Sequence, residues 1–208
     1  MEIWLDSVGS DLIKKAKRTG ILHGVTTNPA ILRESHLPPE ETLCELLAIQ
    51  EGPITAQVAA ETVEEMIKEG QTFHKISTRI IVKVPVTEEG IEVIHALSKA
   101  GIPVMATVIF HAHQVLLAAK AGAEYAAPYF SRMGDEAKAE AELELMQRVG
   151  RQYGVKVLVA SLRTLEHIAM CMRLGVAAVT VKEGLFRELV ATSESTAKIV
   201  EHFRVVGR

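Results

Sequence analysis

Aromatic residues and cysteines are scarce in this chain of 208 residues, of which 4% are aromatic and two are cysteines. Cys44 and Cys171 lie far apart without metal-ligand spacing, which argues against a disulfide framework and indicates reduced, structural thiols. A core with so few aromatics must consist mainly of Ala, Val, Ile and Leu, as parallel α/β sheets prefer. The chain is 48% hydrophobic and 24% charged, so a disordered protein is also excluded.

The chain also lacks a strong excess of one charge and any long apolar run. Its formal net charge is -3, with acidic and basic residues interleaved, which argues against broad electrostatic binding to nucleic acid. No apolar run approaches the roughly 18 residues that a membrane span needs. The amino terminus, residues 1–6, becomes acidic too early for a signal peptide. We therefore expect a cytoplasmic protein that binds neither nucleic acid nor a membrane.

Motifs for common cofactors are missing as well. The chain has no G-x-G-x-x-G and no P-loop pattern, so neither a dinucleotide nor a nucleoside triphosphate has an obvious binding site. His111 and His113 are two residues apart at an expected strand-to-helix junction, but no third ligand follows at a metal-binding spacing. We therefore expect no metal site.

What is present is an alternation of short apolar runs with longer helical patterns, which is typical of a parallel sheet. The expected strands are residues 3–5, 24–26, 54–58, 79–84, 103–109, 125–127, 155–160 and 178–181. The clearest helices, with apolar residues three or four positions apart, are residues 91–100, 114–121, 136–152, 165–173 and 195–203. The spacing of roughly 20 to 32 residues between strands matches a barrel of ~250 residues divided by eight. We therefore predict a single (β/α)8 TIM barrel domain over residues 1–208.

In such barrels the chemistry lies at the C-terminal ends of the strands, where the most informative polar residue is Lys83. It interrupts the apolar run of residues 80–86, which is typical of a strand buried on both faces. Burial lowers the pKa of a lysine and leaves a neutral amine that can attack a carbonyl carbon. The competing interpretation is a side chain that carries its ammonium group from the strand end into solvent.

Four further polar residues stand at predicted strand ends. Asp6 ends the first strand and can shuttle protons, although a solvated loop carboxylate is the alternative. Gln57 lies in a buried strand, where an unpaired amide is costly, so it needs a polar partner. Thr107 and Tyr129 follow on later strands, with structural hydrogen bonds as the competing explanation.

A phosphate site is predicted from the late strands. Arg132, Ser161 and Arg163 follow the expected sixth and seventh strands, and a guanidinium group matches two phosphate oxygens at once. Phosphate sites are common at the late strands of these barrels. Surface ion pairs are the alternative for either arginine.

Several of these residues lie in seven short segments that form one ordered set of motifs. The segments are Trp4-Leu5-Asp6, Gly24-Val25-Thr26-Thr27-Asn28-Pro29, Ala56-Gln57-Val58, Val82-Lys83-Val84-Pro85-Val86-Thr87, Ala121-Gly122-Ala123-Glu124-Tyr125, Ala127-Pro128-Tyr129 and Ala160-Ser161. They resemble the small transaldolase and fructose-6-phosphate aldolase family, within the class I aldolases. The resemblance covers nearly the whole chain, and the order and spacing of G-V-T-T-N-P and V-K-V-P are highly specific.

The resemblance implies a (β/α)8 barrel that acts on sugar phosphates with no metal or organic cofactor, and homo-oligomeric rings, pentamers or decamers, with the C-terminal helix packed on a neighbouring subunit. It makes Lys83 the Schiff-base residue and Asp6 its proton-transfer partner. The remaining roles are dihydroxyacetone contacts for Thr26 and Asn28, a water site for Gln57, Thr107 and Tyr129, and phosphate contacts for Arg132, Ser161 and Arg163.

Two positions distinguish the aldolase branch from the transaldolase branch. Gln57 and Tyr129 resemble the aldolases, since transaldolases have Glu and Phe there. The resemblance therefore implies cleavage or formation of fructose 6-phosphate from dihydroxyacetone and glyceraldehyde 3-phosphate. The alternative is a transaldolase of the pentose phosphate pathway that transfers dihydroxyacetone to erythrose 4-phosphate. That branch is favoured by Arg163 and by residues 108–110, whereas Lys182 is unusual for either because proline or an apolar residue is common there.

Two other classes of protein remain as alternatives. A phosphosugar isomerase or epimerase would share the barrel and the arginines but would need a carboxylate or histidine base, with Lys83 as an electrophile. A non-catalytic barrel would bind a sugar phosphate without turning it over. Replacing Lys83 and testing for a carbonyl adduct distinguish both from an aldolase.

Overall fold

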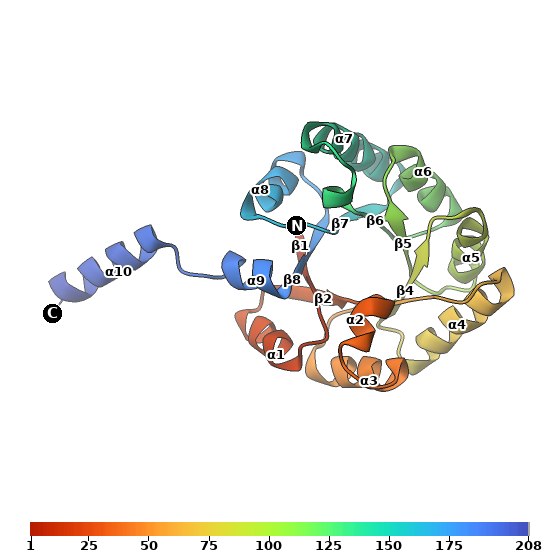
Figure 1. The fold of residues 1–208 in the computed structure, drawn as a ribbon, viewed down its shortest axis with the longest axis horizontal. Coiled ribbons are helices and arrows are strands. Elements are labelled where there is room, and N and C mark those ends of the chain that lie inside the picture. The colour runs from red at the N-terminus through yellow and green to blue at the C-terminus, as the bar shows by residue number, and fades with distance from the viewer. Residues whose placement is uncertain (208) are drawn as a thin grey trace.

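The computed structural model describes residues 1–207, and its strands form a closed parallel barrel in chain order, surrounded by helices (Figure 1). The eight predicted strands are confirmed, with ends that differ by at most two residues. They are β1 (Glu2–Asp6), β2 (Leu22–Thr26), β3 (Ile54–Gln57), β4 (Ile80–Pro85), β5 (Val104–Ile109), β6 (Tyr125–Pro128), β7 (Lys156–Val159) and β8 (Ala178–Lys182). The barrel closes where β1 pairs with β8, with Asp6 opposite Lys182.

The five predicted helices are confirmed, and further helices complete the ring. The helices are α1 (Ser10–Thr19), α2 (Pro29–Arg33), α3 (Pro39–Ile49), α4 (Val63–Ile76), α5 (Glu88–Lys99), α6 (Ala112–Ala121), α7 (Glu136–Tyr153), α8 (Leu165–Leu174), α9 (Glu183–Leu189) and α10 (Glu194–Val206), with a 3-10 turn, η1 (Phe130–Arg132). Four of the helices end at left-handed glycines, Gly20, Gly122, Gly154 and Gly175, where a side chain would strain the backbone.

The buried side chains form two clusters because each strand alternates between the helices and the barrel interior. The larger cluster lies between strands and helices and is mostly aliphatic. The smaller one fills the interior with Trp4, Ile81, Met105, Tyr125, Ala127, Leu158 and Ala178. Gly24 makes room for this filling, since a Cβ atom there would lie 2.6 Å from the Trp4 ring and from the Pro53 carbonyl oxygen. The interior is therefore packed below the mouth of the barrel.

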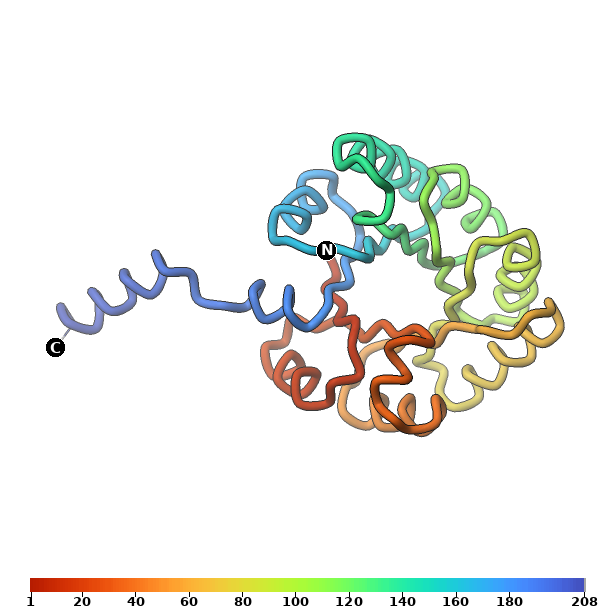
Figure 2. The backbone as a smooth tube through the Cα atoms, in the orientation of Figure 1, coloured from red at the N-terminus to blue at the C-terminus, as the bar shows by residue number. Residues whose placement is uncertain are grey.

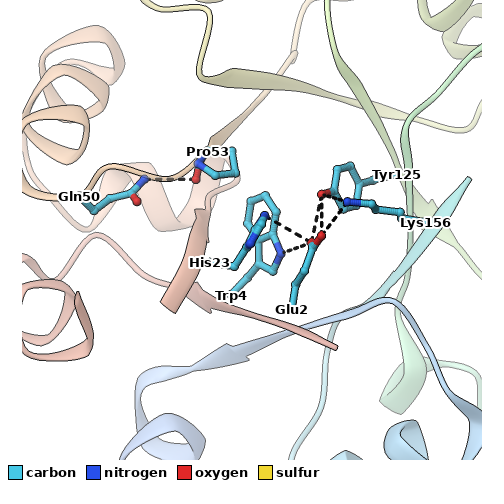
Figure 3. A network of polar contacts seen from close by, with 7 residues as sticks. All are labelled: Glu2, Trp4, His23, Gln50, Pro53, Tyr125 and Lys156. Carbon is cyan, nitrogen blue, oxygen red and sulfur yellow. Dashed lines mark hydrogen bonds and ion pairs between the residues drawn. The ribbon is translucent and has the colours of Figure 1, made fainter. Parts of the chain in front are cut away.

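A polar network closes the N-terminal end of the barrel around the Glu2 carboxylate (Figure 3). The carboxylate accepts hydrogen bonds from Trp4 Nε1 at 3.0 Å, the Tyr125 hydroxyl at 3.0 Å and Lys156 Nζ at 2.7 Å, and His23 Nε2 lies 3.6 Å away. Burial alone would raise the pKa of Glu2, but the bonds from Lys156 and Trp4 outweigh it and hold this pKa below its ordinary value. The network links strands from both halves of the chain.

The last helix, α10, stands away from the barrel at the end of an extended connection (Figures 1 and 2). It has no buried residues, although it carries large apolar side chains. Ile199, Val200, Phe203, Val205 and Val206 are all exposed, Phe203 by 67%. None of the helices between residues 1 and 207 combines the length and hydropathy of a membrane-spanning helix.

Candidate functional site

A cavity of about 500 Å³ opens at the C-terminal ends of the strands, where a barrel of this kind carries its chemistry. Most of the predicted site residues line this cavity, although they lie far apart in the sequence. These are Asp6, Thr26, Asn28, Gln57, Lys83, Tyr129, Arg132 and Ser161. Thr107 is fully buried beside Tyr129, and Arg163 lines a neighbouring cavity.

Lys83 lies on β4 with only 4% of its surface exposed. Its Nζ atom donates a hydrogen bond of 2.9 Å to the carbonyl oxygen of Thr27. Burial lowers the pKa of the amine, and the negative charge of Asp6 partly opposes this. Lys83 is therefore a buried amine at the cavity wall, and its burial favours the neutral form, which is the form that attacks carbonyl groups.

Asp6 belongs to a short chain of hydroxyl groups that crosses three adjacent strands. The hydroxyl of Thr26 donates to Asp6 Oδ1 at 2.6 Å and lies 2.6 Å from the hydroxyl of Thr180. These contacts fix the carboxylate at the cavity wall. Sequence reasoning missed Thr180, because a threonine within β8 is equally expected as a strand-forming residue.

Asn28 connects β2 to the short helix α2. Its side-chain oxygen accepts hydrogen bonds from the backbone nitrogens of Ala30 at 2.9 Å and Ile31 at 3.1 Å, which caps the helix. The cap fixes the amide plane, and Nδ2 remains as the donor group of this side chain.

Gln57, Thr107 and Tyr129 supply further polar atoms in or beside the cavity wall. Gln57 pairs in register with Lys83, and its buried Oε1 atom has no hydrogen-bond partner among residues 1–207. The Thr107 hydroxyl donates to the Tyr129 hydroxyl at 3.3 Å. A buried acceptor without a partner indicates a place for a water or a ligand.

Two residues that line the cavity have left-handed backbones. Val108 has a φ of 60° and Ser161 a φ of 63°, backbone conformations that residues other than glycine rarely adopt. At Val108 the register between β5 and β6 shifts, and Val108 lines the cavity. Such strain clusters at functional sites, where the surrounding fold enforces it.

Cationic groups stand at the cavity rim. Arg33, Arg132 and Lys182 all line it, and the Arg132 guanidinium lies 5.1 Å from the centre of the Tyr129 ring. Arg163 is not among the residues that line this cavity; it lines another one, and its backbone nitrogen donates to His167 Nδ1 at 3.2 Å. Arg33, which sequence reasoning missed, also lines an adjoining cavity of about 510 Å³.

His111 and His113 lie outside this site. Their rings stack with centroids 5.5 Å apart at the start of α6. Over residues 1–207, no three His, Cys, Asp or Glu side chains converge as metal ligands.

Comparison with known proteins identifies the family of this chain. The family model described as "Transaldolase/Fructose-6-phosphate aldolase" matches residues 3–206. A probable transaldolase of Thermodesulfovibrio yellowstonii is 35% identical over 193 residues, which cover 91% of this chain and 90% of the relative. One from Methanococcus maripaludis is 37% identical over 185 residues, covering 87% and 86%.

The barrel also resembles more distant solved structures. A mandelate oxidase variant superposes with a TM-score of 0.62 at 16% identity, covering 97% of this chain and 71% of that one. This likeness concerns the fold alone. Because the family model spans nearly the whole chain and the relatives exceed one third identity, the chain belongs to the transaldolase and fructose-6-phosphate aldolase family and is an enzyme, a lyase or a transferase, of sugar phosphates.

Proposed function

We propose that the protein is a Schiff-base aldolase that cleaves or forms fructose 6-phosphate from dihydroxyacetone and glyceraldehyde 3-phosphate. The observation that carries this proposal is the buried amine of Lys83 in one cavity with the Tyr129 hydroxyl. A neutral amine forms the covalent intermediate, and a pocket hydroxyl can hold the water that protonates it.

The first half of the reaction forms the imine. Lys83 Nζ attacks the C2 carbonyl carbon of the ketose phosphate, and the carbinolamine loses water to become an iminium ion. Asp6, held by Thr26, is the carboxylate available to accept and return these protons. Thr26 and Asn28 are the proposed contacts of the dihydroxyacetone part of the substrate.

The second half breaks the C3–C4 bond. The C4 hydroxyl gives its proton to the Asp6 carboxylate, the electron pair of the C3–C4 bond moves towards the iminium nitrogen to form the enamine, and glyceraldehyde 3-phosphate leaves. Its phosphate is assigned to Arg132, Ser161 and Arg163. Water held by Gln57, Thr107 and Tyr129 then protonates the enamine at C3, and hydrolysis releases dihydroxyacetone and regenerates Lys83.

A transaldolase is the second candidate, and the names of the relatives favour it, since those from Thermodesulfovibrio and Methanococcus are both called probable transaldolases. In that reaction the enamine waits for erythrose 4-phosphate and attacks its aldehyde carbon. The two activities share every step up to the enamine, so the fate of this intermediate separates them.

The deciding experiment measures release of glyceraldehyde 3-phosphate from fructose 6-phosphate, with and without erythrose 4-phosphate. Turnover without the acceptor is expected for the aldolase. Turnover that requires the acceptor replaces that proposal with the transaldolase. No turnover in either assay, with no borohydride-trapped adduct, overturns both and leaves an isomerase, an epimerase or a binding protein.

We further propose that the chain assembles into homo-oligomeric rings, pentamers or decamers, through α10. This is supported by the exposed apolar side chains of a helix that stands apart from its own barrel. Exposed apolar patches of this kind mark interaction surfaces.

A further inference from the structure

Lys182 is the last residue of β8 and lines the same cavity as Lys83. Its register partner on β1 is Asp6. The side chain is exposed to solvent at the mouth of the barrel. It therefore carries a positive charge at the entrance of the site, where a substrate passes.

This charge has no counter-ion within residues 1–207. The ion pairs of that part of the chain include neither Lys182 nor Arg132. The adjacent Glu183 is engaged elsewhere, because it accepts a hydrogen bond of 2.6 Å from Ser7 and lies 3.8 Å from Arg187. An unpaired cation at a cavity wall is available to an anionic ligand.

Arg132 and Ser161 follow β6 and β7, and Lys182 ends β8, so the three residues come from three successive strands of the barrel. All three line the cavity, and Ser161 has a strained left-handed backbone conformation. The Ser161 hydroxyl makes no hydrogen bond to residues 1–207, so it is free to donate. Two cations around a free hydroxyl at the late strands make a phosphate site.

We propose that Lys182 binds the phosphate of the aldehyde substrate together with Arg132 and Ser161, and that it sets the preference of this enzyme for phosphorylated over neutral aldehydes. The inference rests on the proposed carbon–carbon bond chemistry, but it concerns the mouth of the site and not Lys83. An ammonium group is a compact point charge that does not need the paired geometry of an arginine, so it suits a rim position.

The test compares aldol addition of dihydroxyacetone to glyceraldehyde 3-phosphate and to unphosphorylated glyceraldehyde. We expect Lys182→Met to lower the ratio of kcat/KM for the two aldehydes by roughly tenfold, mainly through KM of the phosphorylated one, as loss of one charge-assisted hydrogen bond predicts. Lys182→Arg should restore most of the ratio. The matched control is Lys99→Met, because Lys99 is an exposed lysine in the last turn of α5, at the other end of the barrel.

Each outcome decides between the assignments. An unchanged ratio in Lys182→Met, with an active wild type, overturns the inference, and a loss of the ratio only in Arg163→Met assigns the phosphate to Arg163. A wild type inactive with both aldehydes contradicts the proposed function instead. In that case calorimetric binding of glyceraldehyde 3-phosphate still tests Lys182, since equal affinity of the wild type and Lys182→Met sinks the assignment.

Discussion

The Nζ atom of Lys83 donates a hydrogen bond of 2.9 Å to the backbone carbonyl of Thr27, inside a cavity wall where burial lowers the pKa of the amine. This hydrogen bond fixes the position of the amine through one of its N–H groups, so it does not occupy the lone pair with which a neutral amine attacks a carbonyl carbon. We predict that borohydride treatment in the presence of dihydroxyacetone adds the mass of the reduced adduct to the peptide that contains Lys83. The same treatment of Lys83→Met should add nothing, and an adduct on another lysine would contradict the assignment.

The lowered pKa of Lys83 also predicts a pH-dependent cost to stability. In the unfolded chain the amine binds its proton up to a pKa of ~10.4, whereas the folded state loses it earlier, so the wild type gains stability as pH rises towards that value. Lys83→Met should therefore be more stable than the wild type at about pH 7, by about 1 to 4 kcal/mol. Urea titrations should find that this gain shrinks towards alkaline pH; a gain that grows with pH contradicts the burial argument.

The Tyr129 hydroxyl accepts a hydrogen bond of 3.3 Å from Thr107, and in the proposed mechanism these two groups hold the water that protonates the enamine. Tyr129→Phe removes that hydroxyl and leaves the ring. We expect the cleavage of fructose 6-phosphate without acceptor to fall by about a hundredfold, the lower range for loss of general acid–base catalysis. Transfer to erythrose 4-phosphate should fall much less, because the acceptor replaces the proton. Equal losses in the two assays would assign Tyr129 a structural role.

Much of this site could be predicted from the sequence, because its residues interrupt apolar strands. Lys83 and Gln57 are conspicuous in buried strands, where a polar side chain requires a partner or a function. Knowing that parallel strands end on the same side of a barrel places such residues together. Locating the strands in the sequence was therefore enough to predict most of the polar residues that line the cavity.

Contacts between distant parts of the chain could not be predicted in this way. Glu2 meets Lys156 across 154 positions only because β1, β6 and β7 converge in the closed barrel. Thr180 fits a strand as well as a site, and the direction of α10 depends on an extended connection without periodicity. These features follow from closure and side-chain geometry, which local patterns do not encode.

Close approach at Gly24 predicts a specific packing defect. A Cβ atom there would lie 2.6 Å from the Trp4 ring and the Pro53 carbonyl oxygen, which cannot both move in a packed interior. We expect Gly24→Ala to destabilise the protein by about 1 to 3 kcal/mol. Thermal unfolding measures this change. Gly184→Ala is the matched control, because a Cβ atom there meets nothing within 4 Å, and its unfolding temperature should not fall.

The network at the N-terminal end predicts sensitivity to acid. Since hydrogen bonds hold the pKa of Glu2 below its ordinary value, its contribution to stability is present above that ordinary value and is lost as pH falls through the lower, folded one. We expect Glu2→Gln to cost about 1 kcal/mol at neutral pH, after discounting for solvent screening, and to flatten the acid limb of the stability curve.

The partner of Glu2 titrates at the other end of the pH range. The bonds to Glu2 and Tyr125 raise the pKa of Lys156 to about 12, so its contribution to stability is fully present below the ordinary lysine pKa and is lost as pH rises from there through the folded value. A double-mutant cycle with Lys156→Met should reveal coupling to Glu2. The pair of Lys17 and Glu51 has the same 2.7 Å separation but is exposed, and its cycle should find no measurable coupling.

The exposed apolar side chains of α10, called here its apolar stripe, predict how the proposed oligomer can be separated into subunits. They are Ile199, Val200, Phe203, Val205 and Val206. Phe203 is 67% exposed on a helix with no buried residue, so a second copy is the surface available to cover it. In size-exclusion chromatography with light scattering, we expect the wild type to have the mass of a ring of several subunits. Phe203→Glu should give smaller species, because burying a carboxylate in the interface is costly. His202→Glu adds the same charge beside the stripe and should leave the ring intact. A monomeric wild type would contradict assembly through α10.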